Sequence, residues 1–202
     1  MKNIYKFILL SALLSSVLTG CVSENDTDIP YLDPPPLPSI FNESFDTNFS
    51  NWIKFSKTGS QTWQLDTQYG NPGSCAKMNG FSGVANANID WLISPAQDFS
   101  GISSAKLDFD NAYKFPGPPI EVYVSNNYTG AGDPEVAGVT WTKINGAVLS
   151  PSPGNYTYVN SDPLDISAFT GAGNAAVYIA FKYTSTTSEA STWELDNINV
   201  TE

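Results

Sequence analysis

The sequence predicts an all-β fold, a two-sheet antiparallel β-sandwich of jelly-roll type. Short runs of residues alternate between apolar and polar side chains, which is the period-2 pattern of strands. Clusters of Gly, Pro, Asn, Asp and Ser separate these runs, as turns do, and no long stretch has helical periodicity. The predicted domain covers residues 40–202, a length that suits a single hydrophobic core.

Residues 1–20 have the pattern of a signal peptide. Lys2 and Lys6 precede an apolar run, residues 7–18, that is too short to be a good membrane span. The following Leu18-Thr19-Gly20-Cys21 resembles the lipobox of bacterial lipoproteins. This resemblance implies that Cys21 becomes the first mature residue and carries acyl chains that anchor the protein in a membrane. An ordinary secretory signal with an unrelated cysteine is the alternative.

Residues 21–39 have the composition of a tether. Acidic residues at 24–28 give way to five prolines between 30 and 38, a composition that cannot bury a core and favours extended chain. An acidic stretch directly after the lipidated cysteine resembles the surface-export signal of Bacteroidetes lipoproteins. That resemblance implies a lipid-anchored protein of the outer membrane that is exposed at the cell surface.

The charge balance excludes some partners. The chain has nine basic residues, all of them lysines, against twenty acidic residues, a net charge of −11. Loss of Lys2 and Lys6 with the signal peptide leaves a net charge of −13. Such a surface repels nucleic acid and anionic lipid headgroups, and it favours a divalent cation. If Cys21 is lipidated, Cys75 is left alone, so no disulfide framework is expected.

The predicted domain contains a series of strand candidates. Three tryptophans, Trp63, Trp91 and Trp193, occupy strand patterns and are predicted to lie in the core. The strand patterns before the last strand recur at residues 63–65, 89–93, 107–109, 120–124, 141–144, 156–159 and 177–183.

The last predicted strand, residues 192–200, breaks its own alternation. Apolar residues occupy odd positions as far as Leu195 and even positions from Ile198, which predicts a β-bulge at Asp196-Asn197. If Ile198 and Val200 face the core, Asp196 shares that face. A carboxylate among apolar neighbours needs a cation or loses its charge.

The first predicted strand has the same feature, because Glu43 shares a face with Phe41 and Phe45. If the terminal strands pair, Glu43 and Asp196 come together and repel each other without a cation. Structural Ca²⁺ suits this place because it takes oxygen ligands from carboxylates, amides, carbonyls and water. Zinc does not, because the chain has no histidine. A hydrogen-bonded or protonated carboxylate is the alternative.

Several blocks occur in the order found in choice-of-anchor J and cleaved adhesin domains, which the chain resembles over nearly the whole domain. Those families are jelly-roll modules of bacterial surface and secreted proteins, and several bind structural calcium. The resemblance implies a surface module for adhesion or ligand binding, with Asp90 as a third calcium ligand. A solvated turn acid is the alternative for Asp90, and Asn197 stands where these families often have an aspartate. The matching blocks are Glu43-Ser44-Phe45-Asp46 with Trp52, Ile89-Asp90-Trp91-Leu92-Ile93-Ser94-Pro95, Leu107-Asp108-Phe109-Asp110, Glu121-Val122-Tyr123-Val124-Ser125, Ile179-Ala180-Phe181-Lys182-Tyr183 and Trp193-Glu194-Leu195-Asp196-Asn197-Ile198.

Aromatic residues beside Gly, Pro and Asn are candidates for ligand binding, because an exposed ring can stack on a sugar or a peptide. Rings folded under a rigid connection are the alternative. The expected ligand is an extracellular glycan, with a protein or matrix component as the second choice. The candidate rings are Tyr69, Tyr113, Phe115 and Tyr128.

No catalytic residue or cofactor other than calcium is predicted. Glu194-Leu195-Asp196 resembles the start of the Glu-x-Asp-x-x-Glu catalytic strand of laminarinase-type glycoside hydrolases, but Asn199 occupies the third acidic position and cannot exchange a proton. Without histidine, Ser-His-Asp and Cys-His arrangements are impossible. A concanavalin-type or degraded hydrolase remains an alternative function, and a structural component of a surface complex is another.

Overall fold

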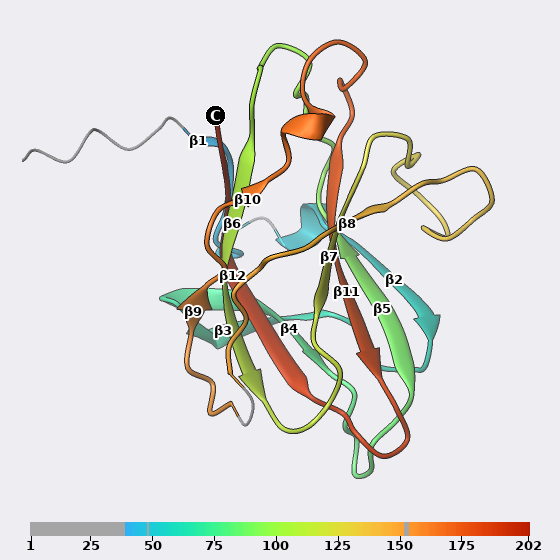
Figure 1. Ribbon diagram of the computed structural model, residues 1–202. Helices are drawn as coiled ribbons and strands as arrows, with labels where there is room; N and C mark the ends of the chain where they lie inside the picture. The colour runs from blue at the N-terminus through green and yellow to red at the C-terminus, as the bar shows by residue number, and fades with distance from the viewer. Residues whose placement is uncertain (1–38, 48, 152–153) are drawn as a thin grey trace, which may run out of the picture. The chain divides into compact units, whose positions relative to one another are not determined.

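Two antiparallel β-sheets pack face to face, as the sequence predicts (Figure 1). The computed structural model describes residues 39–47, 49–151 and 154–202. The predicted signal peptide, the tether as far as residue 38 and Cys21 lie outside these residues. In the described part of the chain, no helix is long and apolar enough to cross a membrane.

The first sheet, called sheet A, has the strand order β10-β6-β12-β4-β3. In addition, β1 pairs with β12, and β9 pairs with β6. Its strands are β1 (Ser39–Glu43), β3 (Gln64–Gly70), β4 (Gly73–Asn79), β6 (Lys106–Lys114), β9 (Val159–Asn160), β10 (Leu164–Asp165) and β12 (Thr192–Thr201). The second, sheet B, has the order β2-β5-β11-β7-β8. Its strands are β2 (Ile53–Thr58), β5 (Asn88–Ile93), β7 (Glu121–Ser125), β8 (Thr142–Ile144) and β11 (Tyr178–Ser185). Two 3₁₀ helices, η1 (Phe49–Asn51) and η2 (Ser167–Phe169), complete the described elements.

Strand β12 is the centre of sheet A. One of its edges pairs with β6 along most of its length, with a register shift between Asp196 and Asn199. Along the other edge, residues 192–195 pair with β4 and residues 198–201 pair with β1. Asn197 has φ 46°, the left-handed backbone of a bulge residue. The predicted bulge and the predicted pairing of the terminal strands are both confirmed, and the bulge lies where β12 changes partner.

The core fills the space between the sheets. Trp63 and Trp193 are buried there, and the rings of Phe109 and Phe181 meet edge to face across the two sheets, with centroids 5.0 Å apart. Trp91 is also buried, but it belongs to a separate cluster on the outer face of sheet B. The prediction that these three tryptophans are core residues is therefore confirmed, with Trp91 in a second, smaller core.

Candidate functional site

The outer face of sheet B is covered by the connection between β7 and β8, residues 126–141, here called the strap. Tyr128 and Trp141 of the strap pack on Trp91, Tyr178 and their neighbours, with Trp91 and Trp141 ring centroids 5.3 Å apart. Tyr128 is 4% exposed. The prediction that Tyr128 is an exposed ligand-binding ring is therefore wrong, because its ring seals the strap against the sheet.

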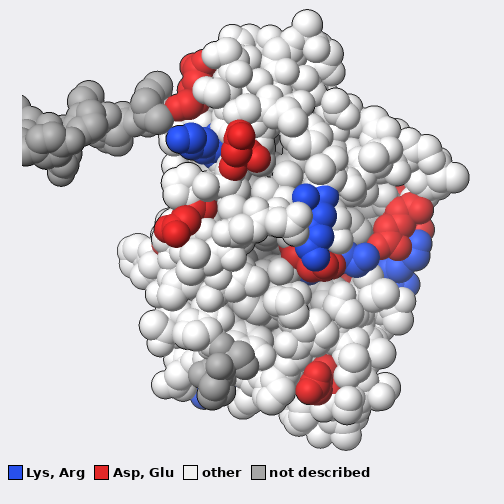
Figure 2. Space-filling view, in the orientation of Figure 1, with Lys and Arg blue, Asp and Glu red and all other residues white. Residues whose placement is uncertain are grey.

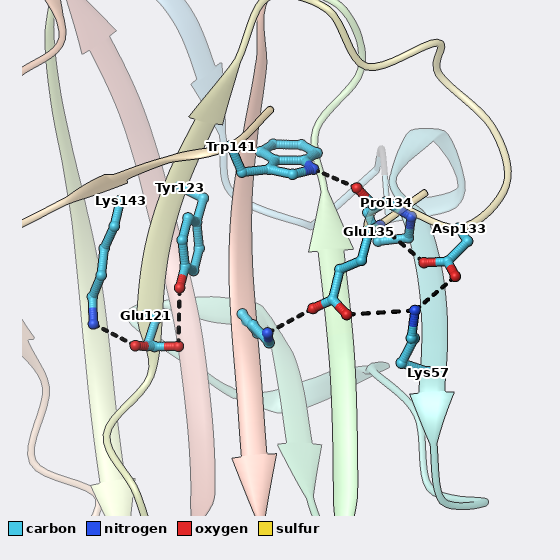
Figure 3. A network of polar contacts seen from close by, with 9 residues as sticks. Lys57, Glu121, Tyr123, Asp133, Pro134, Glu135, Trp141 and Lys143 are labelled. Carbon is cyan, nitrogen blue, oxygen red and sulfur yellow. Dashed lines mark hydrogen bonds and ion pairs between the residues drawn. The ribbon is translucent and has the colours of Figure 1, made fainter. Parts of the chain in front are cut away.

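Ion pairs join one part of the strap to strands β2 and β11 (Figure 3). Lys57 of β2 lies 2.7 Å from Asp133 and 3.5 Å from Glu135, and Lys182 of β11 lies 2.7 Å from Glu135. Trp141 Nε1 donates a hydrogen bond to the Pro134 carbonyl at 2.9 Å. The Lys182 ammonium holds the pKa of Glu135 below its ordinary value. The strap thus covers the aromatic cluster on the outer face of sheet B.

A hollow of about 700 Å³ lies over the outer face of sheet A. Strand β3 contributes Tyr69, which is 57% exposed, and the connection between β8 and β9 contributes Tyr156 and Tyr158. The Tyr158 hydroxyl donates to the Tyr69 carbonyl at 2.8 Å, which ties the two walls together. We call this site the tyrosine hollow. It is lined by Gln68, Tyr69, Gly70, Lys77, Tyr156, Tyr158 and Glu194.

Lys77 of the tyrosine hollow forms ion pairs with two carboxylates. Lys77 Nζ lies 3.0 Å from Asp66 Oδ2 and 3.5 Å from Glu194 Oε1. Glu194 is 2% exposed, and burial raises its pKa although Lys77 acts in the opposite direction. Burial also lowers the pKa of Lys77, but its contacts with the two acids outweigh this and raise it. Lys77 therefore stays charged and is neutralised inside the site.

Two further hollows continue from the first. A hollow of about 480 Å³ shares Lys77 with it and is also lined by the 60–62 turn. A third hollow, of about 550 Å³, shares Asn79 and Phe81 with the second and includes Phe115. The surface from Tyr69 to Phe115 is thus a row of three adjoining hollows.

The predicted ligand-binding rings are distributed unevenly. Tyr69 lines the tyrosine hollow, and Phe115, 49% exposed with φ 68°, lines the third hollow. Tyr113 is 3% exposed and packs on Trp193 at 4.7 Å between ring centroids, so the prediction that it is a loop ring is wrong. It belongs to β6, whose odd positions face the core from Leu107 onward.

The three predicted metal ligands lie in different surroundings. Glu43 Oε1 accepts a hydrogen bond from Phe45 N at 2.6 Å, and its Oε2 accepts one from Trp52 Nε1 at 3.1 Å. Asp196 accepts from Asn71 N at 2.5 Å and from Asn197 N at 2.7 Å. Hydrogen bonding to backbone or indole groups thus satisfies both carboxylates at least in part.

Asp90 differs from the other two, because it lies in sheet B and neither carboxylate oxygen has a hydrogen-bond partner. Burial raises its pKa to about 7, and the Ser56 hydroxyl lowers it only in part. Burial also raises the pKa of Asp196, to about 6. Within residues 39–47, 49–151 and 154–202, no group of three or more His, Cys, Asp or Glu residues is placed to hold a metal ion.

These features define a jelly-roll module with one covered face and one open face. The chain belongs to the family described as "Domain of unknown function (DUF5017)", whose model matches residues 82–202. That match includes Tyr156, Tyr158 and Glu194 but begins after Tyr69 and Lys77. A search of the curated proteins found no match.

Solved structures similar to this chain include the cleaved adhesin domains of Lys-gingipain. The K1 domain, from Porphyromonas gingivalis W83, is 19% identical with a TM-score of 0.54, covering 79% of this chain and 96% of that one. The K2 domain is 20% identical with a TM-score of 0.54, covering 80% and 99%. At this identity the likeness concerns the fold. It supports the jelly-roll fold that the sequence motifs predict.

Proposed function

We propose that this domain binds a neutral oligosaccharide on the outer face of sheet A and carries out no chemistry. The observation that carries the proposal is the tyrosine hollow, where the exposed ring of Tyr69 and the half-buried ring of Tyr156 accompany paired charges. Flat aromatic faces provide apolar contact for a sugar ring, and polar groups at the edges fix its hydroxyls.

Charge favours a neutral ligand over an acidic one. Lys77 is shared between Asp66 and Glu194, so this lysine offers no spare positive charge to a uronic acid or a sulfate. On the face drawn in Figure 2, acidic and basic side chains are scattered among uncharged residues without a continuous basic patch. A net charge of −11 repels acidic polymers as well.

The row of hollows favours an extended ligand. The tyrosine hollow and the second hollow share Lys77, and the second and third share Asn79 and Phe81. A linear chain of several sugar units can contact more than one hollow at once, whereas a terminal monosaccharide contacts one. Affinity should therefore rise with chain length until the row is filled.

A glycan array tests this proposal, with the Cys21→Ser chain as the soluble protein. We expect binding to a class of neutral oligosaccharides, stronger for longer members, and little binding to acidic glycans. Retention only on sulfated or uronic glycans, or on none, would overturn the proposal.

A protein ligand is the second candidate, and the third hollow favours it. Phe81, Val84 and Phe115 are about half exposed or more and lie together there, which is the composition of a protein contact. Adhesion to a protein would then depend on Phe81 and Phe115 and not on Tyr69. Replacing Phe81 with Ser separates the two functions when a short oligosaccharide is used, because a sugar that occupies only the tyrosine hollow does not reach Phe81.

A catalytic function has less support. The acids of the tyrosine hollow, Asp66 and Glu194, share Lys77, and Glu194 is almost fully buried beneath it. A glycosidase needs one carboxyl group that donates a proton to the leaving oxygen and a second that attacks or activates water. We therefore propose binding without hydrolysis. Release of reducing ends from a bound oligosaccharide would contradict this.

We also propose that Cys21 is lipidated and holds the domain at the outer surface of the outer membrane, as the lipobox and the tether composition support. Calcium binding near Glu43 and Asp196 stays a prediction.

A further inference from the structure

Lys77 and two acidic side chains meet on the outer face of sheet A, each from a different strand. Glu194 of β12 lies directly opposite Lys77 of β4 in the antiparallel ladder. On the other side of β4, Gln64 of β3 lies opposite Lys77, so Asp66 projects from the same face further along β3. Lys77 Nζ lies 3.0 Å from Asp66 Oδ2 and 3.5 Å from Glu194 Oε1. The pairing of the strands thus holds one amine against two carboxyl groups.

Burial separates this group from an ordinary surface ion pair. The side chains of Lys77, Asp66 and Glu194 are 28%, 18% and 2% exposed. Within the described residues, Glu194 Oε2 is buried and has no hydrogen-bond partner. The Tyr69 ring covers the lysine, with its centroid 5.2 Å from Nζ. Glu194 therefore faces Lys77 from beneath, with little access to water.

Lys57 of β2 provides a comparison within the same molecule. Its Nζ lies 2.7 Å from Asp133 and 3.5 Å from Glu135, which are nearly the distances found at Lys77. The side chains of Lys57, Asp133 and Glu135 are 33%, 37% and 33% exposed, and Glu135 is also paired with Lys182. Lys57 thus has two acidic partners that are both partly exposed, whereas Lys77 has one that is buried.

We propose that Lys77 and Asp66 join in an amide bond, with Glu194 as the group that moves the protons. Glu194 takes a proton from the Lys77 ammonium, and the freed amine attacks Cγ of Asp66. The bond between Nζ and Cγ forms, and one Cγ–O bond breaks as that oxygen receives protons and leaves as water. Two ammonium protons leave in the water and one stays on the amide nitrogen, so Glu194 ends as it began. The reaction needs no oxidant, reductant or cofactor.

Proximity favours this reaction, which is unfavourable between free groups in water. Cγ of Asp66 is bonded to the oxygen that lies 3.0 Å from Lys77 Nζ, so the nitrogen is at most one bond length farther from the carbon. Groups held at about 3 to 3.5 Å in the right orientation react as if present at about 10⁵ M or more. Such an effective concentration favours the amide over its hydrolysis.

The bond would fasten one edge of the proposed ligand-binding face. Strand β3 is an outer strand of sheet A, and its pairing with β4 is irregular between Asp66 and Gly70, the segment that carries Tyr69. An amide at Asp66 keeps this segment beside β4. It removes one positive and one negative charge together, so the net charge of the tyrosine hollow is unchanged. Bond formation itself does not depend on ligand binding.

Tryptic digestion of the unfolded protein tests the bond directly. The Cys21→Ser chain is purified in its folded state, denatured, digested and analysed by tandem mass spectrometry. Without the bond, trypsin cleaves after Lys77 and releases residues 58–77 and 78–106. With the bond this cleavage is blocked, and we expect one fragment, residues 58–106, lighter than its sequence mass by one water molecule.

Fragment spectra should locate the link between Lys77 and Asp66, and cleavage after Lys57 should be normal. Complete cleavage after Lys77 would overturn the proposal. A link from Lys77 to Glu194, or an equal cross-link at Lys57, would also overturn it, because the assignment rests on a buried Glu194 beside a reacting Asp66.

Three variants of the Cys21→Ser chain separate the reaction from the ion pair, with circular dichroism as the check of folding. Lys77→Arg keeps the positive charge and the tryptic site but has no amine, so it should be cleaved after position 77. Asp66→Ala should also be cleaved there. Glu194→Gln keeps both reacting groups, and its cross-linked fraction should grow about 100-fold more slowly after expression begins. An equal rate in Glu194→Gln would refute the role of Glu194.

Discussion

Replacement of Glu43 by alanine should destabilise the domain by an amount that the structure allows us to estimate. Glu43 accepts hydrogen bonds from Phe45 N and Trp52 Nε1, both of them buried. The first of these holds Phe45 at φ 60°, where its ring packs on Trp52 at 5.3 Å. Each buried donor that loses its acceptor costs about 1 to 3 kcal/mol, so the variant should lose about 2 to 6 kcal/mol. The thermal midpoint should fall by about 5 to 20 °C.

Thermal unfolding followed by tryptophan fluorescence, in chelator and in excess calcium, measures this loss. The matched control is Glu121→Ala, which removes a surface carboxylate paired with Lys143 and should change stability by less than about 1 kcal/mol. The loss in Glu43→Ala should be present in chelator, because hydrogen bonds cause it. Any extra loss in calcium measures binding of the ion by Glu43. A variant as stable as wild type in chelator would refute the reasoning.

Three other predictions concern the strap, the buried thiol and the anchor. Glu135→Gln should lower stability by about 1 kcal/mol at pH 7. Since the pKa of Glu135 is lowered in the fold, this difference should be complete above the ordinary value of 4.5 and should be lost as the pH falls through the lowered value. A pH-independent difference would contradict the ion-pair account. Cys75 is buried with its pKa raised to about 12, so a thiol reagent at pH 8 should modify it only on unfolding; rapid labelling of the native protein would be inconsistent with this. Cys21→Ser should move the protein from the membrane to the soluble fraction, and tight membrane association of that variant would disprove lipidation.

The strands that were predicted correctly have strong apolar alternation. Strands β5 and β11 pair in register through Ile93 and Ala180, in segments dense in Ile, Leu, Val and aromatic residues. Strand β4 was missed because Gly73–Asn79 contains small residues and no β-branched side chain. It is a strand because β12 and β3 pair with it on both sides. Such tertiary pairing leaves no local signal.

The candidate site was predicted only in part, and the reasons lie in contacts between distant segments. Alternation places Glu194 opposite Trp193 in β12 and so on the outer face. Its burial depends on the chain that carries Tyr156 and Tyr158, held to β6 through β9. The alternation of apolar residues in β12 predicts its bulge. It does not predict that the strand paired along one edge of β12 changes from β4 to β1 at that point.

Tyr113 and Tyr128 show the limit of assigning exposure from neighbouring residues. Tyr113 precedes a Pro-rich connection, yet it continues the core positions of β6. Tyr128 follows two asparagines, yet the strap folds its ring onto Tyr178. The residues next to an aromatic ring in the sequence therefore do not determine whether that ring is buried or exposed.

Titration calorimetry of the Cys21→Ser chain with a neutral oligosaccharide, against the same chain carrying Tyr69→Ala and Tyr156→Ala, tests the central claim most directly. Loss of two stacked rings should remove about 2 kcal/mol of binding free energy, a fall in affinity of about 30-fold. Val136→Ala, at an exposed position on the strap, is the control and should bind as the Cys21→Ser chain does. Equal affinity in the double variant, or a loss confined to Val136→Ala, would show that sheet A is not the binding face.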